Sequence, residues 1–339
     1  MVRKIIVIIL MAVFMVSQSG TFAQADRASA RIKRLISQLE DKKRRLDAQR
    51  QLSSYGEEVV QHVVPVLRST FDPVVRTAAL RIIAKVGDSS VEDDIVVFLK
   101  DSNHKVRQEA ARTLGVIGKK DTTIDALKAA LNDHFPNVRY HIIRALSQMP
   151  RASETEIFVG SLGDYDPRIR KFAVVALGDL KSVEAIPYLS QMVGDIDPGV
   201  RVELVNTFEK IASPECLQPL VWLMGDFEPN IRVQAVEAIG KVKSDKTEDA
   251  LVEAASSMDP RIASTAITEL TARKSSRALE IAKAHIDDEH MSVKVAAIES
   301  IGKMGGNDDK PLLTKLLSAE STTVRKKAGE ALAFIGSGA

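Results

Sequence analysis

The apolar positions of this chain recur at helical spacing, and the whole pattern repeats along the sequence. Around Arg170, apolar residues stand one position before the arginine and three, four and seven positions after it: Ile169, Ala173, Val174 and Leu177. This spacing places them on one face of an α-helix. The pattern returns every 31 residues, with a single step of 32, at the anchor positions Arg45, Arg76, Arg107, Arg139, Arg170, Arg201, Arg232, Ala263, Lys294 and Arg325. Ten copies at a near-constant period predict an array of structural repeats.

Each copy is predicted to contain two helices, the second of which carries the anchor. In four copies the second helix is expected to begin at an aspartate followed by proline, since aspartate caps free backbone N–H groups and proline at the first helical position forfeits no hydrogen bond. These caps are Asp72, Asp166, Asp197 and Asp259. Glycines that follow the apolar stripe are predicted C-caps: Gly87, Gly118, Gly305 and Gly336. Apolar residues five positions before an anchor are predicted to plug the turns: Phe71, Tyr165, Ile196, Phe227 and Met258.

The predicted fold class is all-α, an α-α superhelix of about ten helix pairs that forms one solenoid over residues 26–339. A helix pair cannot bury its apolar face alone, so neighbouring pairs must stack into a continuous core. Residues 26–56 fit the repeat register and carry many charges, as expected of an N-terminal capping repeat.

The turn D-P-x-V/I-R resembles the HEAT repeat family, in its short bacterial form of roughly 31 residues, over residues 28–336. The resemblance implies a ladder between each anchor arginine and an aspartate six residues before it. The pairs that fit are Asp101/Arg107, Asp133/Arg139, Asp164/Arg170, Asp195/Arg201, Asp226/Arg232 and Asp288/Lys294. The eighth copy has Ser257 and Ala263 in these places, and its neighbourhood is rich in alanine. We therefore expect a bend or a soft point near residues 244–285.

Residues 1–25 have the features of a signal peptide. Arg3 and Lys4 are followed by an apolar run from Ile5 to Val16, and residues 23–25 read Ala-Gln-Ala. The run is shorter than the about 20 residues that a membrane span needs. We expect an exported, periplasmic protein with no stable membrane span after cleavage. Secretion, or retention by an uncleaved anchor, remain alternatives.

The net charge and the lack of catalytic sequence motifs narrow the range of functions to be expected. The 47 lysines and arginines nearly match the 45 aspartates and glutamates, and removal of Arg3 and Lys4 makes the remainder formally neutral. Nucleic-acid binding, which needs a basic excess, is not expected. Some HEAT-like families are enzymes, but the chain lacks the His-Glu dipeptides of their di-iron members, and its single cysteine, Cys216, lies among apolar residues without a catalytic partner. We expect no catalytic residues, no metal and no cofactor.

The candidate binding site is a column of residues five positions after the anchors, which the resemblance places on the concave face. Four arginines, Arg50, Arg81, Arg112 and Arg144, give way to neutral residues and then to acids that include Glu237 and Glu299. Tyr140, His141 and Phe172 lie at the changeover, where aromatic side chains often anchor a partner. The alternative is that exposed helical positions simply favour Arg and Glu, and that Phe172 is peripheral core.

The predicted function is that of a non-catalytic, exported scaffold that binds a protein or peptide partner on its concave face. One alternative is an envelope component that self-assembles head to tail through its oppositely charged ends. A lyase-like or other HEAT-like enzyme is a third class, disfavoured by the missing ligand and nucleophile patterns.

Overall fold

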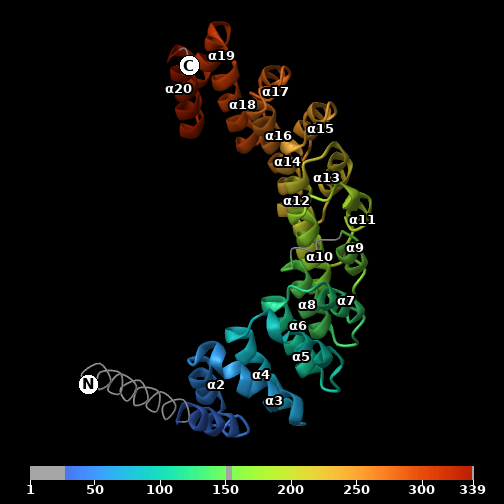
Figure 1. Ribbon diagram of the computed structural model, residues 1–339. Helices are drawn as coiled ribbons and strands as arrows, with labels where there is room; N and C mark the ends of the chain where they lie inside the picture. Colours follow the sequence, from blue (N-terminus) through green and yellow to red (C-terminus); the bar gives the residue numbers. More distant parts are fainter. Residues whose placement is uncertain (1–26, 150–154, 338–339) are drawn as a thin grey trace, which may run out of the picture. The chain divides into compact units, whose positions relative to one another are not determined.

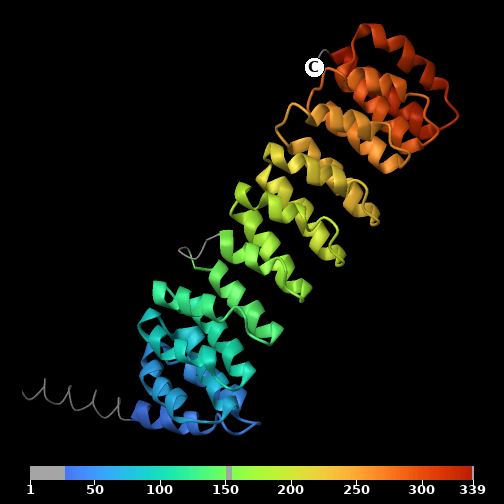
Figure 2. The same ribbon diagram turned by 90° about the vertical axis from the view of Figure 1, so that its right-hand side faces the viewer.

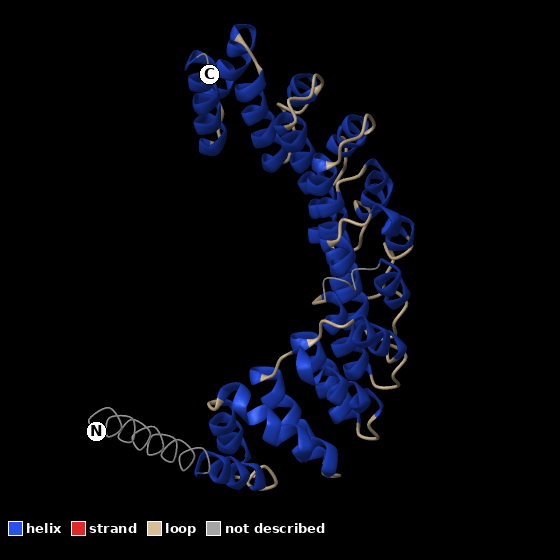
Figure 3. Cartoon of the chain, in the orientation of Figure 1, coloured by secondary structure: helices blue, strands red, loops and turns tan. Residues whose placement is uncertain are grey.

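The computed structural model describes residues 27–149 and 155–337, and no strand occurs among them (Figure 1, Figure 3). The predicted all-α solenoid with about ten helix pairs is confirmed. The chain groups into two compact units, residues 1–154 and 155–339, called unit 1 and unit 2 below. The predicted signal segment lies outside the described residues. No helix in the described part of the chain is long and apolar enough to cross a membrane.

Unit 1 begins with a helix over residues 27–37. Its further α-helices are α2 (Arg45–Ser53), α3 (Val60–Ser69), α4 (Pro73–Val86), α5 (Glu92–Val96), α6 (His104–Ile117), α7 (Asp121–Ala129) and α8 (Pro136–Ser147). Among these, α2, α4, α6 and α8 are the second helices, which carry the anchor residues. Neighbouring second helices pack on one another, α2 on α4, α4 on α6 and α6 on α8.

Unit 2 continues the same alternation of first and second helices (Figure 2). Its α-helices are α9 (Thr155–Ser161), α10 (Pro167–Asp179), α11 (Ile186–Ser190), α12 (Pro198–Ile211), α13 (Leu217–Leu223), α14 (Pro229–Lys241), α15 (Thr247–Ala255), α16 (Pro260–Ala272), α17 (Ala278–Ala284), α18 (Met291–Met304), α19 (Lys310–Lys315) and α20 (Thr322–Ser337). The even-numbered members are the second helices, and each packs on the next.

The predicted helix starts are confirmed, and the predicted helix ends are confirmed in part. The side chains of Asp72, Asp166, Asp197 and Asp259 accept a backbone N–H from the first turn of the following helix. Gly87, Gly118 and Gly305 follow their helices directly, with extended rather than left-handed backbones. Gly336 does not cap a helix, since it lies inside α20.

Close packing of second helices depends on small residues at their contacts. A Cβ atom added to Gly115 of α6 would lie 2.9 Å from the Cα atom of Ala145 in α8. A Cβ atom added to Gly302 of α18 would lie 2.8 Å from the Cα atom of Ala331 in α20. The buried core around these contacts is aliphatic. The apolar stripe and the short period of the sequence repeat were therefore enough to predict it.

The aspartate–arginine ladder exists, but its ion pairs join successive repeats instead of forming within one. Within its own repeat, Arg170 donates from Nη1 to the backbone oxygen of Asp164 at 2.8 Å. Its Nε and Nη2 atoms both donate at 2.7 Å to the carboxylate of Asp195 in the next repeat. The described ion pairs of this kind are Arg76–Asp101, Arg107–Asp133, Arg170–Asp195 and Arg201–Asp226. The guanidinium thus ties two turns together.

The eighth copy keeps an ion pair with the seventh, although Ser257 and Ala263 leave both of its ladder positions without a charge. Arg232 pairs with the helix cap Asp259 at 2.7 Å, because Ser257 offers no carboxylate. One repeat later, Ala263 has no charge for Asp288, which contacts His285 at 3.3 Å and His290 at 3.4 Å instead of Lys294. The ladder is therefore broken between the eighth and ninth copies but not between the seventh and eighth.

The residues predicted to plug the turns are exposed, so this prediction was wrong. Phe71, Tyr165, Ile196, Phe227 and Met258 expose 89% to 98% of their surface. In the turns of Tyr165, Ile196 and Phe227 the inner side is occupied by the anchor guanidinium, whereas the anchor of the Met258 turn is Ala263. Arg170, for example, also donates to the backbone oxygen of Tyr165, and Arg232 to that of Phe227. With the arginine inside, the apolar side chain points to solvent.

Candidate partner-binding site

The four predicted arginines lie on the four second helices of unit 1. Arg50 is on α2, Arg81 on α4, Arg112 on α6 and Arg144 on α8. Arg50, Arg81 and Arg144 are exposed and Arg112 is half-buried. Since neighbouring second helices pack on one another, these side chains share one side of unit 1, which we call the second-helix face.

Two of these arginines are held by an acid that sequence reasoning did not identify as part of the site. Glu109 of α6 is buried, with 3% of its surface exposed. Arg81 donates from Nε to its Oε2 atom at 3.0 Å, and Arg112 from Nε to its Oε1 atom at 2.5 Å. Two guanidinium groups on one carboxylate leave a net positive charge, and the shared carboxylate fixes the orientation of both groups. The available signal was the spacing of Glu109, three residues before Arg112 on the same helix.

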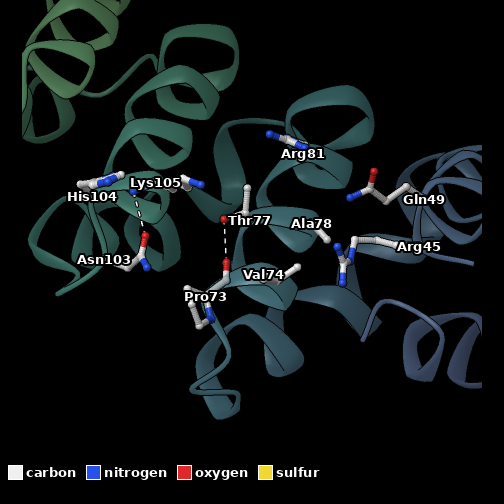
Figure 4. Close-up of a pocket in the computed structure, with 10 residues that line it drawn as sticks. All are labelled: Arg45, Gln49, Pro73, Val74, Thr77, Ala78, Arg81, Asn103, His104 and Lys105. Carbon is white, nitrogen blue, oxygen red and sulfur yellow. Dashed lines mark hydrogen bonds between the residues drawn. The ribbon is translucent and has the colours of Figure 1, made fainter. Parts of the chain in front are cut away.

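A cleft of about 340 Å³ opens on the second-helix face between α2, α4 and α6. Figure 4 shows the side chains of Arg45 and Gln49 from α2 on one side and those of α6 on the other, with residues of α4 between them. Its lining residues are Arg45, Gln49, Pro73, Val74, Thr77, Ala78, Arg81, Asn103, His104 and Lys105. It contains three permanent cations and no acid.

A second cleft of about 230 Å³ continues this surface and shares Gln49 and Arg81 with the first. It adds Arg50 and Lys85, again without an acidic lining residue. We call the cations of both clefts together with Arg112 the basic face: Arg45, Arg50, Arg81, Lys85, Lys105 and Arg112. An extended positive surface of this kind attracts acidic partners.

The aromatic candidates divide between the two units. Tyr140 and His141 are half-buried on α8 of unit 1, with ring centroids 5.4 Å apart and planes inclined by 81°. The Nε2 atom of His141 lies 3.3 Å from Nε2 of Gln108 on α6. Phe172 is half-buried in the middle of α10 in unit 2. That these residues anchor a partner stays a prediction.

The surface around the acidic candidates of unit 2 carries less negative charge than the sequence suggested. Glu299 of α18 is paired with Lys327 of α20 at 2.6 Å. Glu237 of α14 is exposed, but Lys241 on the same helix lies near it and pairs with Glu209. Burial and the nearby Glu237 raise the pKa of Glu269. The lysines, which the column of single positions did not include, neutralise part of this surface.

The described residues contain no group of three or more His, Cys, Asp or Glu side chains arranged to hold a metal ion. Cys216 is buried, and its burial raises the pKa of the thiol to about 11. The thiol is therefore protonated at neutral pH and a poor nucleophile.

Comparison with known proteins agrees with this geometry. A sequence profile of HEAT repeats matches residues 60–134, 124–201, 190–257 and 248–333. The chain belongs to the HEAT repeat family. No curated protein sequence matches it.

Solved HEAT solenoids share the fold at low sequence identity. The karyopherin Kap121p matches 90% of this chain with 13% identity and a TM-score of 0.67, and the match covers 41% of the Kap121p chain. Kap121p bound to the extreme C-terminus of the protein phosphatase Cdc14p gives a TM-score of 0.68, with the same identity and the same coverage. The chain therefore spans less than half the length of this relative. At such identity the likeness shows the fold alone, a solenoid typical of protein-binding scaffolds.

Proposed function

We propose that this HEAT protein is an exported, non-catalytic scaffold whose basic face binds an acidic segment of a partner protein. The observation that carries the proposal is the pair of adjoining clefts on unit 1, both lined by cations and neither by an acid. Glu109 fixes Arg81 and Arg112 in advance, so a partner meets oriented guanidinium groups and loses less side-chain entropy on binding.

Two further points support the proposal. Kap121p, which shares the fold, has been solved bound to Ste12p and bound to Nup53p, so a solenoid of this kind can hold protein partners. Export follows from the apolar run and the Ala-Gln-Ala site within residues 1–25. Protease protection of the protein in intact cells, lost when the outer membrane is opened, tests the periplasmic location.

The binding test uses three exposed cations that take no part in the ladder. The variant Arg50→Glu, Lys85→Glu and Lys105→Glu reverses the basic face while it leaves Glu109 and its two arginines in place. The probe is a fluorescein-labelled peptide of alternating glycine and glutamate, measured by anisotropy, beside an in-cell crosslinking pull-down. We expect affinity to fall at least about tenfold at low salt, because several exposed charge pairs are lost together.

A matched control changes the charge by the same amount elsewhere in unit 1. The control variant carries Lys33→Glu, Lys43→Glu and Lys100→Glu. These three lysines are exposed, like those of the test variant, and lie outside both clefts. This control should retain peptide binding and the crosslinked partner. Equal losses in both triple variants would show a response to net charge and would contradict the proposal.

Head-to-tail assembly receives less support from the structure. It requires an acidic surface at the far end of the chain, and there Lys303 and Lys327 line the same cleft as Glu299 and Glu330. Light scattering separates the two functions, since assembly would make the mass rise with protein concentration and fall with salt.

A further inference from the structure

The first arginine of the ladder has no ladder carboxylate to bind. The next copy carries Thr70 where the ladder requires an aspartate. Thr70 reproduces one half of that aspartate's role, since its hydroxyl accepts the backbone N–H of Asp72 at 3.2 Å, as Asp101 accepts that of Asn103 at 2.8 Å. In Asp101 the second carboxylate oxygen binds Arg76 of the preceding copy, and threonine has no atom equivalent to it.

Arg45 is rotated accordingly. Six later anchor arginines use Nη1 for the backbone oxygen six residues before them: Arg107, Arg139, Arg170, Arg201, Arg232 and Arg325. Arg76 instead uses Nη1 on the carboxylate of Asp101. Arg45 differs from all of these, since it uses Nε on Leu39 at 2.7 Å and Nη2 on Glu40 at 3.1 Å. Among the described residues, its Nη1 atom donates no hydrogen bond and no carboxylate lies at ion-pair distance. The helix cap Asp72 does not replace the missing partner in the way that Asp259 serves Arg232.

The unused Nη1 edge of Arg45 is accessible to a ligand, because this side chain faces a cleft. Arg45 lines the first cleft beside Gln49, whose Nε2 atom is buried and has no hydrogen-bond partner among the described residues. An unsatisfied buried donor costs free energy that a bound acceptor would recover. Lys105 supplies a further donor across the cleft (Figure 4).

We infer that the cleft binds a carboxylate of the partner, which completes the ladder at Arg45 in place of the absent aspartate. This rests on the proposed function and names the group recognised on that face. A carboxylate is the anionic group that an acidic protein segment supplies. It is also the group that the ladder geometry accommodates at Asp101, Asp133, Asp195, Asp226 and Asp259. The unused guanidinium edge offers donors for both carboxylate oxygens, and the amide of Gln49 lies in the wall of the same cleft.

The experiment gives Arg45 an internal partner. Thr70→Asp restores the residue that most ladder positions carry, and Thr70→Asn has nearly the same shape as that aspartate without the charge. We expect Thr70→Asp to weaken binding of the glycine–glutamate peptide about five- to tenfold, since its carboxylate competes for Arg45. Thr70→Asn should bind as the wild type does, and the melting temperature of Thr70→Asp should not fall.

Gln49→Glu tests the same cleft without touching the turn. It places an isosteric carboxylate beside Arg45, so it should also weaken binding of the glutamate peptide. Inorganic phosphate added as a competitor should displace the peptide less effectively than glutarate, a free dicarboxylate, at equal concentration.

Three outcomes would overturn the inference. They are unchanged affinity in both Thr70→Asp and Gln49→Glu, equal losses in Thr70→Asp and Thr70→Asn, or stronger competition by phosphate than by glutarate. If in these cases reversal of Arg50, Lys85 and Lys105 still abolishes binding, the basic face remains the binding surface and only the role of Arg45 is wrong. If that reversal has no effect either, the proposed function fails as well.

Discussion

At the scale of single residues, Glu109 links the stability of unit 1 to its binding surface. Its buried carboxylate holds Arg81 and Arg112, whose side chains are 51% and 39% exposed. We predict that Glu109→Gln lowers the free energy of unfolding by about 1–2 kcal/mol, because two charge-assisted hydrogen bonds are weakened. The same change removes a negative charge from beside the basic face. We expect this gain in attraction to outweigh the lost orientation of the two guanidinium groups, so binding of the glutamate peptide should tighten.

Thermal denaturation and anisotropy on one protein sample measure both effects. Glu203→Gln is the matched control, since Glu203 occupies the equivalent position on α12 and, among the residues that the structure describes, accepts a hydrogen bond from Asn206 and binds no arginine. A loss of stability together with a loss of peptide affinity in Glu109→Gln would contradict the opposite signs expected here.

The ladder aspartates also predict how stability depends on pH. The hydrogen bond from Arg232 is the main reason that the pKa of Asp259 is lowered to about 2. Burial opposes ionisation of Asp195, but hydrogen bonds from Arg170 and from the backbone outweigh it and lower its pKa too. A lowered folded-state pKa stabilises the fold above the unfolded value of about 4, and this contribution is lost as the pH falls toward 2.

We therefore expect a melting temperature that is steady above about pH 5 and falls between about pH 4 and pH 2. Asp259→Asn keeps a good helix cap but removes the charge that Arg232 binds. Its melting temperature should be lower at pH 7 and should fall less steeply in acid. Parallel curves for the two proteins would show that this ion pair contributes nothing.

At the scale of the structural element, the helices were predictable and the inner side of their turns was not. The stripe of Ile169, Ala173 and Leu177 has one physical solution, an α-helix with a buried face. Which side chain fills the turn depends on where the anchor guanidinium goes. It binds backbone oxygens five and six residues before it, and in the described ladder pairs also a carboxylate in the next repeat, as Arg170 does. Local spacing does not contain this pairing. For the same reason the column that yielded the four arginines did not include Glu109, Lys241 or Lys327.

The exposed turn residues give an element-scale prediction. Replacement of Tyr165, Ile196, Phe227 and Met258 together by serine should change the melting temperature very little, because their side chains bury almost no surface. Calorimetry of the fourfold variant measures this directly. The control is Ile169→Ser in the buried stripe of α10, which should be strongly destabilising. A large loss in the turn variant would mean that these side chains pack against the protein in solution.

At the scale of the whole molecule, stability in a repeat array is a sum of terms for each repeat and for each contact with its neighbours. The weakest contact should therefore be visible as the segment that opens most readily. Two observations place it after α16. The ladder has no arginine at Ala263, and Asp288 is left with His285 and His290. The first helices on either side, α15 and α17, bury mainly alanine, which offers little apolar surface.

We predict that backbone amides of residues 244–285 exchange with solvent faster than those of α12 and α14, measured by hydrogen–deuterium exchange mass spectrometry. Ala263→Arg tests the cause, because it places a guanidinium 25 residues before Asp288, the separation found between Arg170 and Asp195. If it completes the ladder, exchange in α16 and α17 should slow while that in α4 and α6 stays unchanged. Ala263→Gln, similar in length but uncharged, should not slow exchange. Uniform exchange along unit 2 in the wild type would contradict a soft segment, and slowing by both variants would assign the effect to packing rather than to the missing ion pair.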